Sequence, residues 1–265
     1  MCSILILRHV HPELPLILAA NRDELLDRPT SGPQRLPGPP RIFVPGLDQV
    51  RGGTWMGVTD TGFFVGLTNQ RGTQNQGVAP RSRGEVVTQT LRAGSLEAAE
   101  RYLDTLEPSD FSPFNLLYGD ALRLRVAYAR PSSGRLVRQD VPDGIHVLPN
   151  DTLDCPELPK VARARMLAAE HARRPWPELA PRLQEVLADH HLPADEQLPA
   201  FPSETPASRE WTRQLQALCI HTPAYGTRSS ALLALSPGRV AHLQASESPP
   251  CHTAFQDFWS LLAPP

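Results

Sequence analysis

The chain has 265 residues, of which 40% are hydrophobic, and its formal net charge at pH 7 is -2. This length allows one large domain or two small ones with a substantial core, as in an ordinary globular protein. The charge shows no basic excess, so the composition gives no reason to expect nucleic acid or an acidic membrane surface as a partner.

Two apolar runs at the start of the chain predict a β-hairpin. Residues 2–10 and 14–20 are rich in Ile, Leu and Val, and the short sequence HPE separates them. This pattern is typical of two mostly buried strands joined by a turn. The first predicted strand begins at Cys2, directly behind the initiator methionine.

The second apolar run is followed by four polar residues: Asn21, Arg22, Asp23 and Glu24. If the strand continues, Arg22 and Asp23 emerge at the end of the hairpin, where they can stand beside Cys2. A cation at that place favours the thiolate form of a cysteine, and a carboxylate can orient a neighbouring amine. The same residues also fit a helix start, with Asn21 as the N-cap and the two acids in the first turn.

A proline-rich connection leads into a second predicted hairpin. Residues 28–46 contain so many prolines that many backbone donors are missing, so we expect a loop without a regular helix or a central strand. Residues 52–58 and 63–69 are rich in Gly, aromatic and β-branched residues, and they flank the turn sequence TDTG. This pattern predicts a second pair of strands.

Helical periodicity begins near the middle of the chain. Ser95 is a suitable N-cap for an amphipathic helix that Pro108 would end, and a shorter helix is expected over residues 84–92. Strand patterns return in three segments: residues 114–120, 122–130 and 135–150. The second of these alternates apolar and arginine side chains, as a half-exposed strand does.

The C-terminal half combines helices, an exposed segment and strands. A helical block is predicted from residue 160 to about residue 190, and the polar, proline-containing residues 192–210 predict an exposed excursion. Residues 218–246 read as three strands joined by turns at AYG and SPG. Because strands and helices do not alternate as in βαβ units, we predict an antiparallel α+β layered fold. We expect a single domain over residues 1–265 that includes a helical and loop excursion at 158–210.

The cysteines are spaced too widely to indicate a metal site. They are Cys2, Cys155, Cys219 and Cys251. Without a C-x-x-C pair, the sequence predicts neither a zinc site nor a disulfide framework, and it fits a reducing, cytoplasmic setting. The first apolar run is cut short by Arg8 and His9, so neither a signal peptide nor a membrane span is predicted.

The position of Cys2 offers an unusual chemistry. Removal of Met1 would leave a thiol and a free α-amine on the same residue. A free thiol with a pKa near ~8.5 is mostly protonated at neutral pH, and an α-amine with a pKa of about 7.7–8.0 can accept its proton. The alternative interpretation is that Cys2 is a small buried apolar residue at the start of a strand.

Six motifs occur along the chain in a characteristic order: MCSI, NRDE, RGGTWMGV, GLTN, HVLPN and YGTRSS. In this the sequence resembles the NRDE family, also called the transport and Golgi organisation 2 family, over nearly its whole length. That family is similar to the N-terminal nucleophile (Ntn) hydrolases whose mature chains begin with cysteine, such as bile salt hydrolases and penicillin V acylases. The resemblance implies a four-layer αββα sandwich, in which helices cover the outer faces of two antiparallel sheets.

The resemblance also implies catalytic roles at the start of the chain. Cys2 matches the nucleophile, and Arg22 matches the arginine that lies close to its sulfur. In the hydrolases an acid usually stands three positions beyond that arginine, where this chain has Leu25. Asp23 or Glu24 must therefore substitute for it, or the role is missing.

Three residues further along the chain complete the expected catalytic set. Asn69 resembles the asparagine that donates to a developing oxyanion, although it also fits a turn. Asn150 resembles the second asparagine of the hydrolase site, and PND would equally make an ordinary turn. Arg228 resembles the late arginine that faces the nucleophile from a neighbouring strand, and it would need a carboxylate partner if buried.

The substrate-binding set expected from these motifs is Asn21, Glu24 and Trp55. Trp55 follows paired glycines and can line a pocket, although an aromatic residue on a strand is more often plain core. No metal and no cofactor are expected at the site.

Three functions remain open from the sequence. The leading one is a cysteine amidohydrolase that cleaves a linear amide or another acyl bond of a small molecule. The second, motivated by Leu25 at the acid position, is a non-catalytic carrier of haem or of a lipid-like acyl compound. His9 and His11 would then be candidate haem ligands, although histidines beside a turn more often face solvent. A scaffold for protein partners has the least support.

Overall fold

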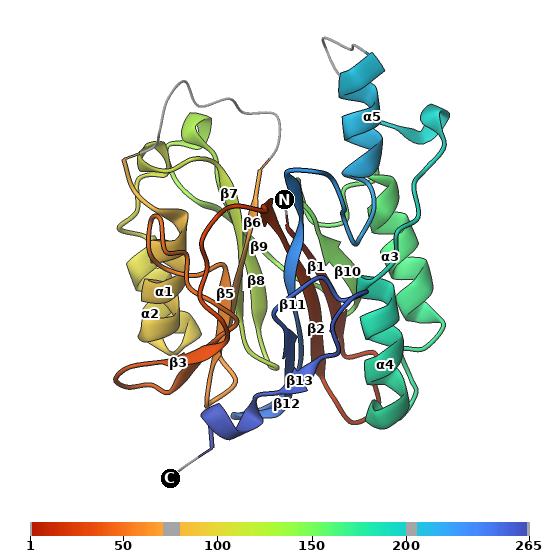
Figure 1. Cartoon of the computed structure of the whole chain (residues 1–265). Coiled ribbons are helices and arrows are strands. Elements are labelled where there is room, and N and C mark those ends of the chain that lie inside the picture. Colours follow the sequence, from red (N-terminus) through yellow and green to blue (C-terminus); the bar gives the residue numbers. More distant parts are fainter. Residues whose placement is uncertain (1, 71–79, 200–205, 264–265) are drawn as a thin grey trace.

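Two antiparallel β-sheets face one another, and helices cover both outer faces (Figure 1). The computed structural model describes residues 2–70, 80–199 and 206–263. The first sheet contains, in order, β10 (Gly144–Leu148), β1 (Cys2–Arg8), β2 (Leu16–Leu25), β11 (Tyr225–Ser236), β12 (Arg239–Ser246) and β13 (Gln256–Asp257). The second contains β3 (Gln34–Leu36), β4 (Ile42–Val44), β5 (Met56–Thr59), β6 (Phe64–Asn69), β7 (Phe114–Gly119), β8 (Leu124–Ala129) and β9 (Val137–Asp140).

Helices pack on each sheet from opposite sides. The second sheet is covered by α1 (Arg83–Ala93) and α2 (Leu96–Leu103), and the first by α3 (Pro159–Ala169) and α4 (Trp176–Leu187) (Figure 1). Helix α5 (Pro206–Gln214) lies beyond α4 in the chain. Ser95 caps α2 as predicted, since its hydroxyl accepts a hydrogen bond from the backbone N–H of Ala98.

Three apolar cores separate the four layers. The core between the sheets contains Ile4 and Leu18 of the first sheet with Phe43 and Phe64 of the second. The outer cores join α3 and α4 to the first sheet and α1 and α2 to the second. Apolar residues on both faces of the central strands explain why the sequence shows runs there instead of alternation. The predicted α+β, four-layer αββα fold is confirmed.

The hairpin of β1 and β2 is the element that positions the start of the chain. Its antiparallel register places Cys2 opposite Arg22 and Arg8 opposite Leu16. The second strand continues through the NRDE motif as far as Leu25. The helix start that Asn21 could have capped is therefore absent, because β11 pairs with this end of β2 and continues the ladder.

Three segments differ from the sequence expectation. The proline-rich residues 28–46 contain the short strands β3 and β4, because Gln34–Leu36 and Ile42–Val44 lie between the prolines and keep the backbone donors that pairing requires. The predicted exposed excursion contains α5 in its described part. Residues 218–246 form two strands and not three, since the first segment makes only an isolated bridge between His221 and Gly226.

Among residues 2–70, 80–199 and 206–263, no helix combines the length and the apolar character required to cross a membrane.

Candidate functional site

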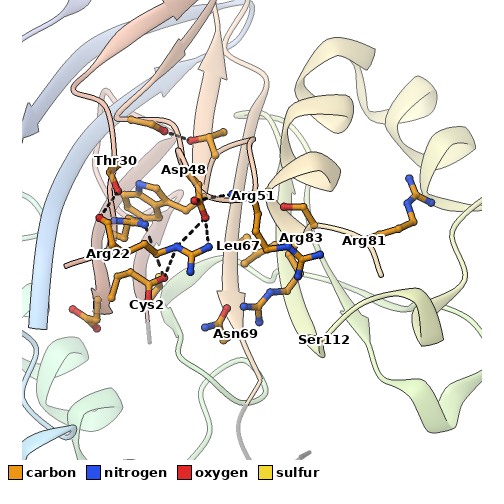
Figure 2. A pocket seen from close by; sticks show the side chains of 18 residues that line it. Cys2, Arg22, Thr30, Asp48, Arg51, Leu67, Asn69, Arg81, Arg83 and Ser112 are labelled. Carbon is orange, nitrogen blue, oxygen red and sulfur yellow. Dashed lines mark hydrogen bonds and ion pairs between the residues drawn. The ribbon is translucent and has the colours of Figure 1, made fainter. Parts of the chain in front are cut away.

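Cys2 and Arg22 form a buried cross-strand pair at one end of the first sheet. Each residue has 6% of its surface exposed, and the register sets them directly opposite one another. Cys2 belongs to the core between the sheets, together with Ile4. Directly opposed side chains in an antiparallel pair lie on the same face with close Cβ atoms. The guanidinium is therefore held beside the thiol, at the wall of a cavity that both residues line (Figure 2).

Asp23 lies next to this pair and is held by β11. Its carboxylate accepts a hydrogen bond of 2.6 Å from the Thr227 hydroxyl, and its backbone carbonyl accepts one of 2.9 Å from the Tyr225 hydroxyl. Burial raises the pKa of the Asp23 carboxyl, while the positive charges of Lys160 and Arg22 act in the opposite direction. The negative charge of Asp23 also acts on the Cys2 thiol.

The environment of Cys2 favours the neutral thiol. Burial raises the pKa of this thiol, and the negative charge of Asp23 raises it further. The backbone N–H of Asp23 and the charge of Arg22 favour the thiolate but do not outweigh burial. The thiol consequently requires a base close by before it can act as a nucleophile.

Glu24 and Asn21 occupy different faces of β2. Glu24 lines the cavity, where its carboxylate lies 3.9 Å from Arg22 and 3.8 Å from Arg28. Asn21 turns away from the cavity, because its Nδ2 donates hydrogen bonds of 2.8 Å to the carbonyls of Leu187 and Leu218. Asn21 therefore ties the sheet to the end of α4, and the structure does not bring it to the site.

Asn69 and Asn150 meet where the two sheets come together. Asn69 ends β6 and lines the cavity. The Nδ2 of Asn150 donates a hydrogen bond of 2.9 Å to the Asn69 carbonyl. Its Oδ1 has no hydrogen-bond partner among the described residues, although the side chain is buried. Because β1 pairs Ile4 with Leu148, continuing that register by two residues brings Asn150 level with Cys2.

A close approach of the two sheets brings β6 to β1. Gly66 lies on β6, and a Cβ at this position would stand 2.9 Å from the Cδ1 of Ile4. A larger residue would also crowd the Phe64 ring, so both side chains would have to shift to make room for it. The Thr68 hydroxyl then fastens the end of β6 with a hydrogen bond of 2.7 Å to the Pro149 carbonyl.

Trp55 lines the cavity, and Gly53 before it contacts the start of α1. Trp55 is 8% exposed, and its indole Nε1 has no hydrogen-bond partner among the described residues. Gly53 has a positive φ of 79°, and a Cβ there would lie 2.2 Å from the carbonyl carbon of Gly84. Glycine is required at this contact, which brings the start of α1 to the cavity.

The cavity has a volume of about 200 Å³ and is lined mainly by charged and polar residues. Its five arginines are Arg22, Arg28, Arg51, Arg81 and Arg83, and its three acids are Asp23, Glu24 and Asp48. Arg28 donates to Asp48 with its Nε at 3.0 Å, and Arg81 donates to Glu85 at 2.8 Å. No carboxylate of the described residues pairs with Arg83, and burial lowers the pKa of its guanidinium. The lining thus has a positive excess.

Arg228 does not reach this cavity. The register of β11 against β2 shifts between Thr227 and Ser229, which leaves Arg228 unpaired at a β-bulge. Its guanidinium donates to the backbone carbonyls of Leu25 and Leu26, at 3.0 Å for Leu25. The bulge thus directs this arginine to the outer end of β2, and it needs no carboxylate partner there.

The family of the chain follows from comparison with known sequences. The profile of the family described as Transport and Golgi organisation 2 matches residues 1–246. This chain belongs to that family. The bovine Transport and Golgi organization protein 2 homolog (Bos taurus) is 30% identical over 231 residues, covering 82% of this chain and 81% of the relative. The human homolog (Homo sapiens) is 29% identical over the same length and the same shares of the two chains.

Solved structures of a hydrolase and of an amidase have the same fold. A mutant of the conjugated bile acid hydrolase from Clostridium perfringens aligns over 97% of this chain and 96% of its own, with a TM-score of 0.56 and 10% identity. The Caenorhabditis elegans N-acylethanolamine-hydrolyzing acid amidase ortholog aligns over 90% and 93%, with a TM-score of 0.50 and 14% identity. This member of the Transport and Golgi organisation 2 family therefore has the fold that its motifs predicted.

Several residues of the site in this family member were not anticipated from the sequence. They are Arg28, Asp48, Arg51, Arg81, Arg83 and Thr227. Arg28 lies in the proline-rich connection, and Arg83 lies at the first position of α1. The RGG of RGGTWMGV was the available signal, because paired glycines indicate a close backbone approach.

The two histidines near the first turn of this family member already have partners within the fold. His11 is buried, its Nε2 lies 2.9 Å from the Arg174 carbonyl, and its Nδ1 accepts from the backbone N–H groups of Glu13 and Leu14. His9 pairs with Asp143 at 2.8 Å. Both ring nitrogens of His11 are thus already engaged, so this residue is not free to bind haem iron.

A histidine–aspartate pair holds the loop that carries Asn150 and predicts a pH dependence of stability. The Nδ1 of His146 lies 2.6 Å from Asp154, which also accepts the Val147 N–H at 2.8 Å. The hydrogen bond to Asp154 raises the pKa of His146. Burial alone would raise the pKa of Asp154, but the hydrogen bonds from His146 and Val147 hold it below its usual range.

This pair is expected to stabilise the protein most at mildly acidic pH. The histidine contributes fully below its unfolded pKa of about 6.5, and the contribution is lost as pH rises through the higher folded value. The aspartate contributes above about pH 3.9 and loses its effect as pH falls through its lower folded value. Between about pH 6 and about pH 8.5, wild type should lose about 1.5 kcal/mol more of its unfolding free energy than Asp154→Asn. Equal losses in urea titrations would contradict the assignment.

Proposed function

We propose that this chain is an N-terminal-cysteine hydrolase that cleaves an amide or another acyl bond of a small molecule, with Cys2 as the nucleophile once Met1 has been removed. The observation that carries the proposal is the buried pair of Cys2 and Arg22 at a cavity that Asn69 also lines. Met1 itself lies outside the described residues.

The proposed reaction begins with a proton transfer within one residue. The α-amine of Cys2, with an ordinary pKa of about 7.7–8.0, accepts the thiol proton, directly or through water. In this proposal the resulting ammonium donates to the Oδ1 of Asn150, which has no hydrogen-bond partner among the described residues, and to the carboxylate of Asp23. A thiol whose pKa is raised by burial depends on such an internal base.

The acyl transfer then follows in two steps. The thiolate sulfur bonds to the acyl carbon, the C–N or C–O bond breaks, and the leaving group takes the proton from the ammonium. Water then attacks the thioester, which releases the acid and restores the thiol. Asn69 donates to the oxyanion in both steps, and Arg22 stabilises the negative charge at the sulfur before attack. Asn150 helps to position Asn69, because the Nδ2 of Asn150 donates a hydrogen bond to the backbone carbonyl of Asn69.

The structural neighbours support this class of reaction. One is titled a conjugated bile acid hydrolase, and the other an N-acylethanolamine-hydrolyzing amidase. Both names describe the hydrolysis of a small molecule. A small acyl compound is accordingly the substrate class we propose for this chain, which needs neither a metal nor a cofactor in this mechanism.

The arginines favour a substrate that carries a negative charge. Arg83 lines the cavity at the start of α1 and forms no ion pair with a carboxylate of the described residues. Its guanidinium donates to the Pro113 carbonyl at 3.4 Å, and burial of its charge is costly even with the more distant Glu24 nearby. An anionic group on the substrate would pair with this guanidinium. A pair of this kind adds about 1.5–3 kcal/mol, which corresponds to roughly 10- to 100-fold in affinity.

Replacing Arg83 with glutamine should therefore raise KM for an anionic N-acyl substrate by at least about tenfold and leave KM for a neutral one nearly unchanged. Arg92→Gln is the matched control, because Arg92 lies in the last turn of the same helix and donates to the Pro39 carbonyl. Product formation from paired anionic and neutral N-acyl compounds measures the difference. An equal rise in KM for both substrates would contradict the proposed preference for anionic substrates.

A carrier of haem or of a lipid-like acyl compound is the second candidate. The positive excess of the cavity supports it, since carboxylates such as the haem propionates would pair with these arginines. The volume of about 200 Å³ argues against a large ligand, since pockets for drug-sized molecules measure about 300–1,000 Å³.

One experiment separates the two candidates. Haem and a panel of N-acyl compounds are added to wild type and to Cys2→Ala, and binding and product formation are both measured. Turnover by wild type alone supports the hydrolase. Saturable binding of equal strength by both forms, with no product from either, supports the carrier.

A further inference from the structure

A second cluster of reactive side chains lies outside the cavity. It consists of His190, Cys219, His221 and Cys251, whose potential ligand atoms all lie within 4.8 Å of one another. These residues come from three separate parts of the chain: the end of the α4 region, the segment that leads into β11, and the loop after β12. The fold has therefore gathered two thiols and two imidazoles that sequence spacing does not reveal.

The distances within the cluster match those of a tetrahedral metal site. The two sulfurs lie 3.6 Å apart, and the Nε2 of His221 lies 3.6 Å from the Cys219 sulfur and 3.2 Å from the Cys251 sulfur. Zinc bonds of about 2.3 Å to sulfur and about 2.0–2.1 Å to nitrogen require tetrahedral edges of about 3.8 Å between sulfurs and about 3.5 Å between sulfur and nitrogen. The atoms are thus nearly at bonding positions around a common centre.

The second histidine is already oriented by a backbone group. The Nδ1 of His190 lies 3.0 Å from the Cys219 carbonyl, to which it can donate a hydrogen bond. Metal-binding histidines usually donate one ring N–H in this way, which fixes the tautomer and leaves the other nitrogen for the metal. In His190 this leaves Nε2 as the ligand atom. Cys219 thus supplies its own sulfur as a ligand and orients His190 with its backbone carbonyl.

We propose that His190, Cys219, His221 and Cys251 bind one zinc ion in a tetrahedral site with two sulfur and two nitrogen ligands. Both thiols release their protons on binding, and both imidazoles bind in the neutral form. Four protein ligands close the coordination sphere, so the site is structural and does not activate water. Two sulfur and two nitrogen ligands select zinc over magnesium or calcium, which prefer oxygen.

The zinc site would fasten the segment that supports Asp23. Between the two sites lies Thr227, whose hydroxyl accepts the Ile220 N–H at 2.9 Å and donates to Asp23 at 2.6 Å. Ile220 stands between two of the four ligands, Cys219 and His221. Metal binding would therefore fix the backbone that positions Thr227. The metal proposal stands independently of the hydrolase, since it requires only the four ligands.

Zinc binding can be measured on the reduced full-length chain. Apo-protein prepared with a chelator is titrated with zinc against a chromophoric competitor, and then with cobalt. We expect about one zinc per chain, a higher melting temperature on loading, and the sulfur-to-cobalt charge-transfer band of tetrahedral thiolate coordination.

Matched serine variants assign the ligands. Cys251→Ser changes an exposed cysteine, and Cys155→Ser changes a cysteine outside the cluster as the control. Cys251→Ser should weaken zinc binding by more than about 100-fold. Changes to residues that only hydrogen-bond to the ligands typically weaken metal binding by about 10- to 100-fold. Cys155→Ser should bind as wild type. His221→Ala, also at an exposed position, provides a second ligand variant, and circular dichroism confirms folding.

Two results would overturn the zinc site. One is reduced, folded wild type that binds zinc no more tightly than Cys251→Ser. The other is a disulfide between Cys219 and Cys251 in the isolated protein whose reduction yields a chain without zinc affinity, since two sulfurs 3.6 Å apart are also close enough to be oxidised to one another.

Discussion

Replacing Cys2 with alanine is expected to abolish turnover, with kcat falling by at least roughly 10⁴-fold, as for other catalytic nucleophiles. The variant keeps a small apolar side chain at a buried strand position, so its fold and melting temperature should change little. The rate of product release from the best N-acyl substrate, together with thermal unfolding, measures both effects. Cys155→Ala is the matched control, because Cys155 is also buried but does not line the cavity.

An N-terminal tag that cannot be removed separates the thiol from its proposed base. The tagged chain retains the Cys2 sulfur but has an amide nitrogen in place of the free amine. Since burial raises the pKa of this thiol, the tagged chain should be as inactive as Cys2→Ala. Full activity of a folded, tagged chain would show that another group deprotonates the sulfur.

Replacing Asn69 with alanine is expected to lower kcat by about 10²–10³-fold, equivalent to about 2.7–4 kcal/mol of transition-state stabilisation. KM should change much less, because the interaction forms only as the oxyanion develops. The backbone carbonyl that anchors Asn150 remains in this variant, so the surrounding loop keeps its hydrogen bond. Steady-state kinetics on one substrate give both constants.

Gln70→Ala is the control for this prediction. Gln70 is the next residue along the chain, but its Nε2 donates a hydrogen bond of 2.8 Å to Asn115, and it does not line the cavity. Its loss should reduce kcat far less than the loss of Asn69. Comparable losses from both variants would indicate that this end of β6 acts through packing and that Asn69 has no special role.

The central pair of the site was predictable from the sequence for a simple geometric reason. The turn HPE is centred on residue 12, and in an antiparallel hairpin the partners of such a turn have numbers that add up to about 24. Cys2 therefore falls opposite Arg22, as the register shows. Local pattern and pairing rules were sufficient here because the two strands are neighbours in the chain.

Other parts of the site depend on contacts between segments distant in the chain. Arg83 reaches the cavity because Gly84 packs against Gly53, and no periodicity encodes this contact. Arg228 lies in the YGTRSS motif, yet a bulge between Thr227 and Ser229 turns it away from the cavity. A shift of one residue in register cannot be read from an apolar pattern, although it decides the direction of a side chain.

The four-residue metal cluster illustrates the same limit more strongly. Its ligands are separated by up to 61 positions along the chain, from His190 to Cys251. Motif reasoning recognises zinc sites by pairs of ligands at short spacing, and Cys219 with His221 is the single such pair here. The packing of the last loop against the end of α4 supplies the rest.

The most direct test of the catalytic account identifies the first residue of the protein and the residue that reacts. The untagged chain is sequenced from its N-terminus, treated with a reactive acyl probe, and mapped by peptide mass spectrometry. We predict chains that begin at Cys2 and carry the acyl group on that residue alone. Acylation of another residue, or labelling of Cys2 in chains that still retain Met1, would contradict the account.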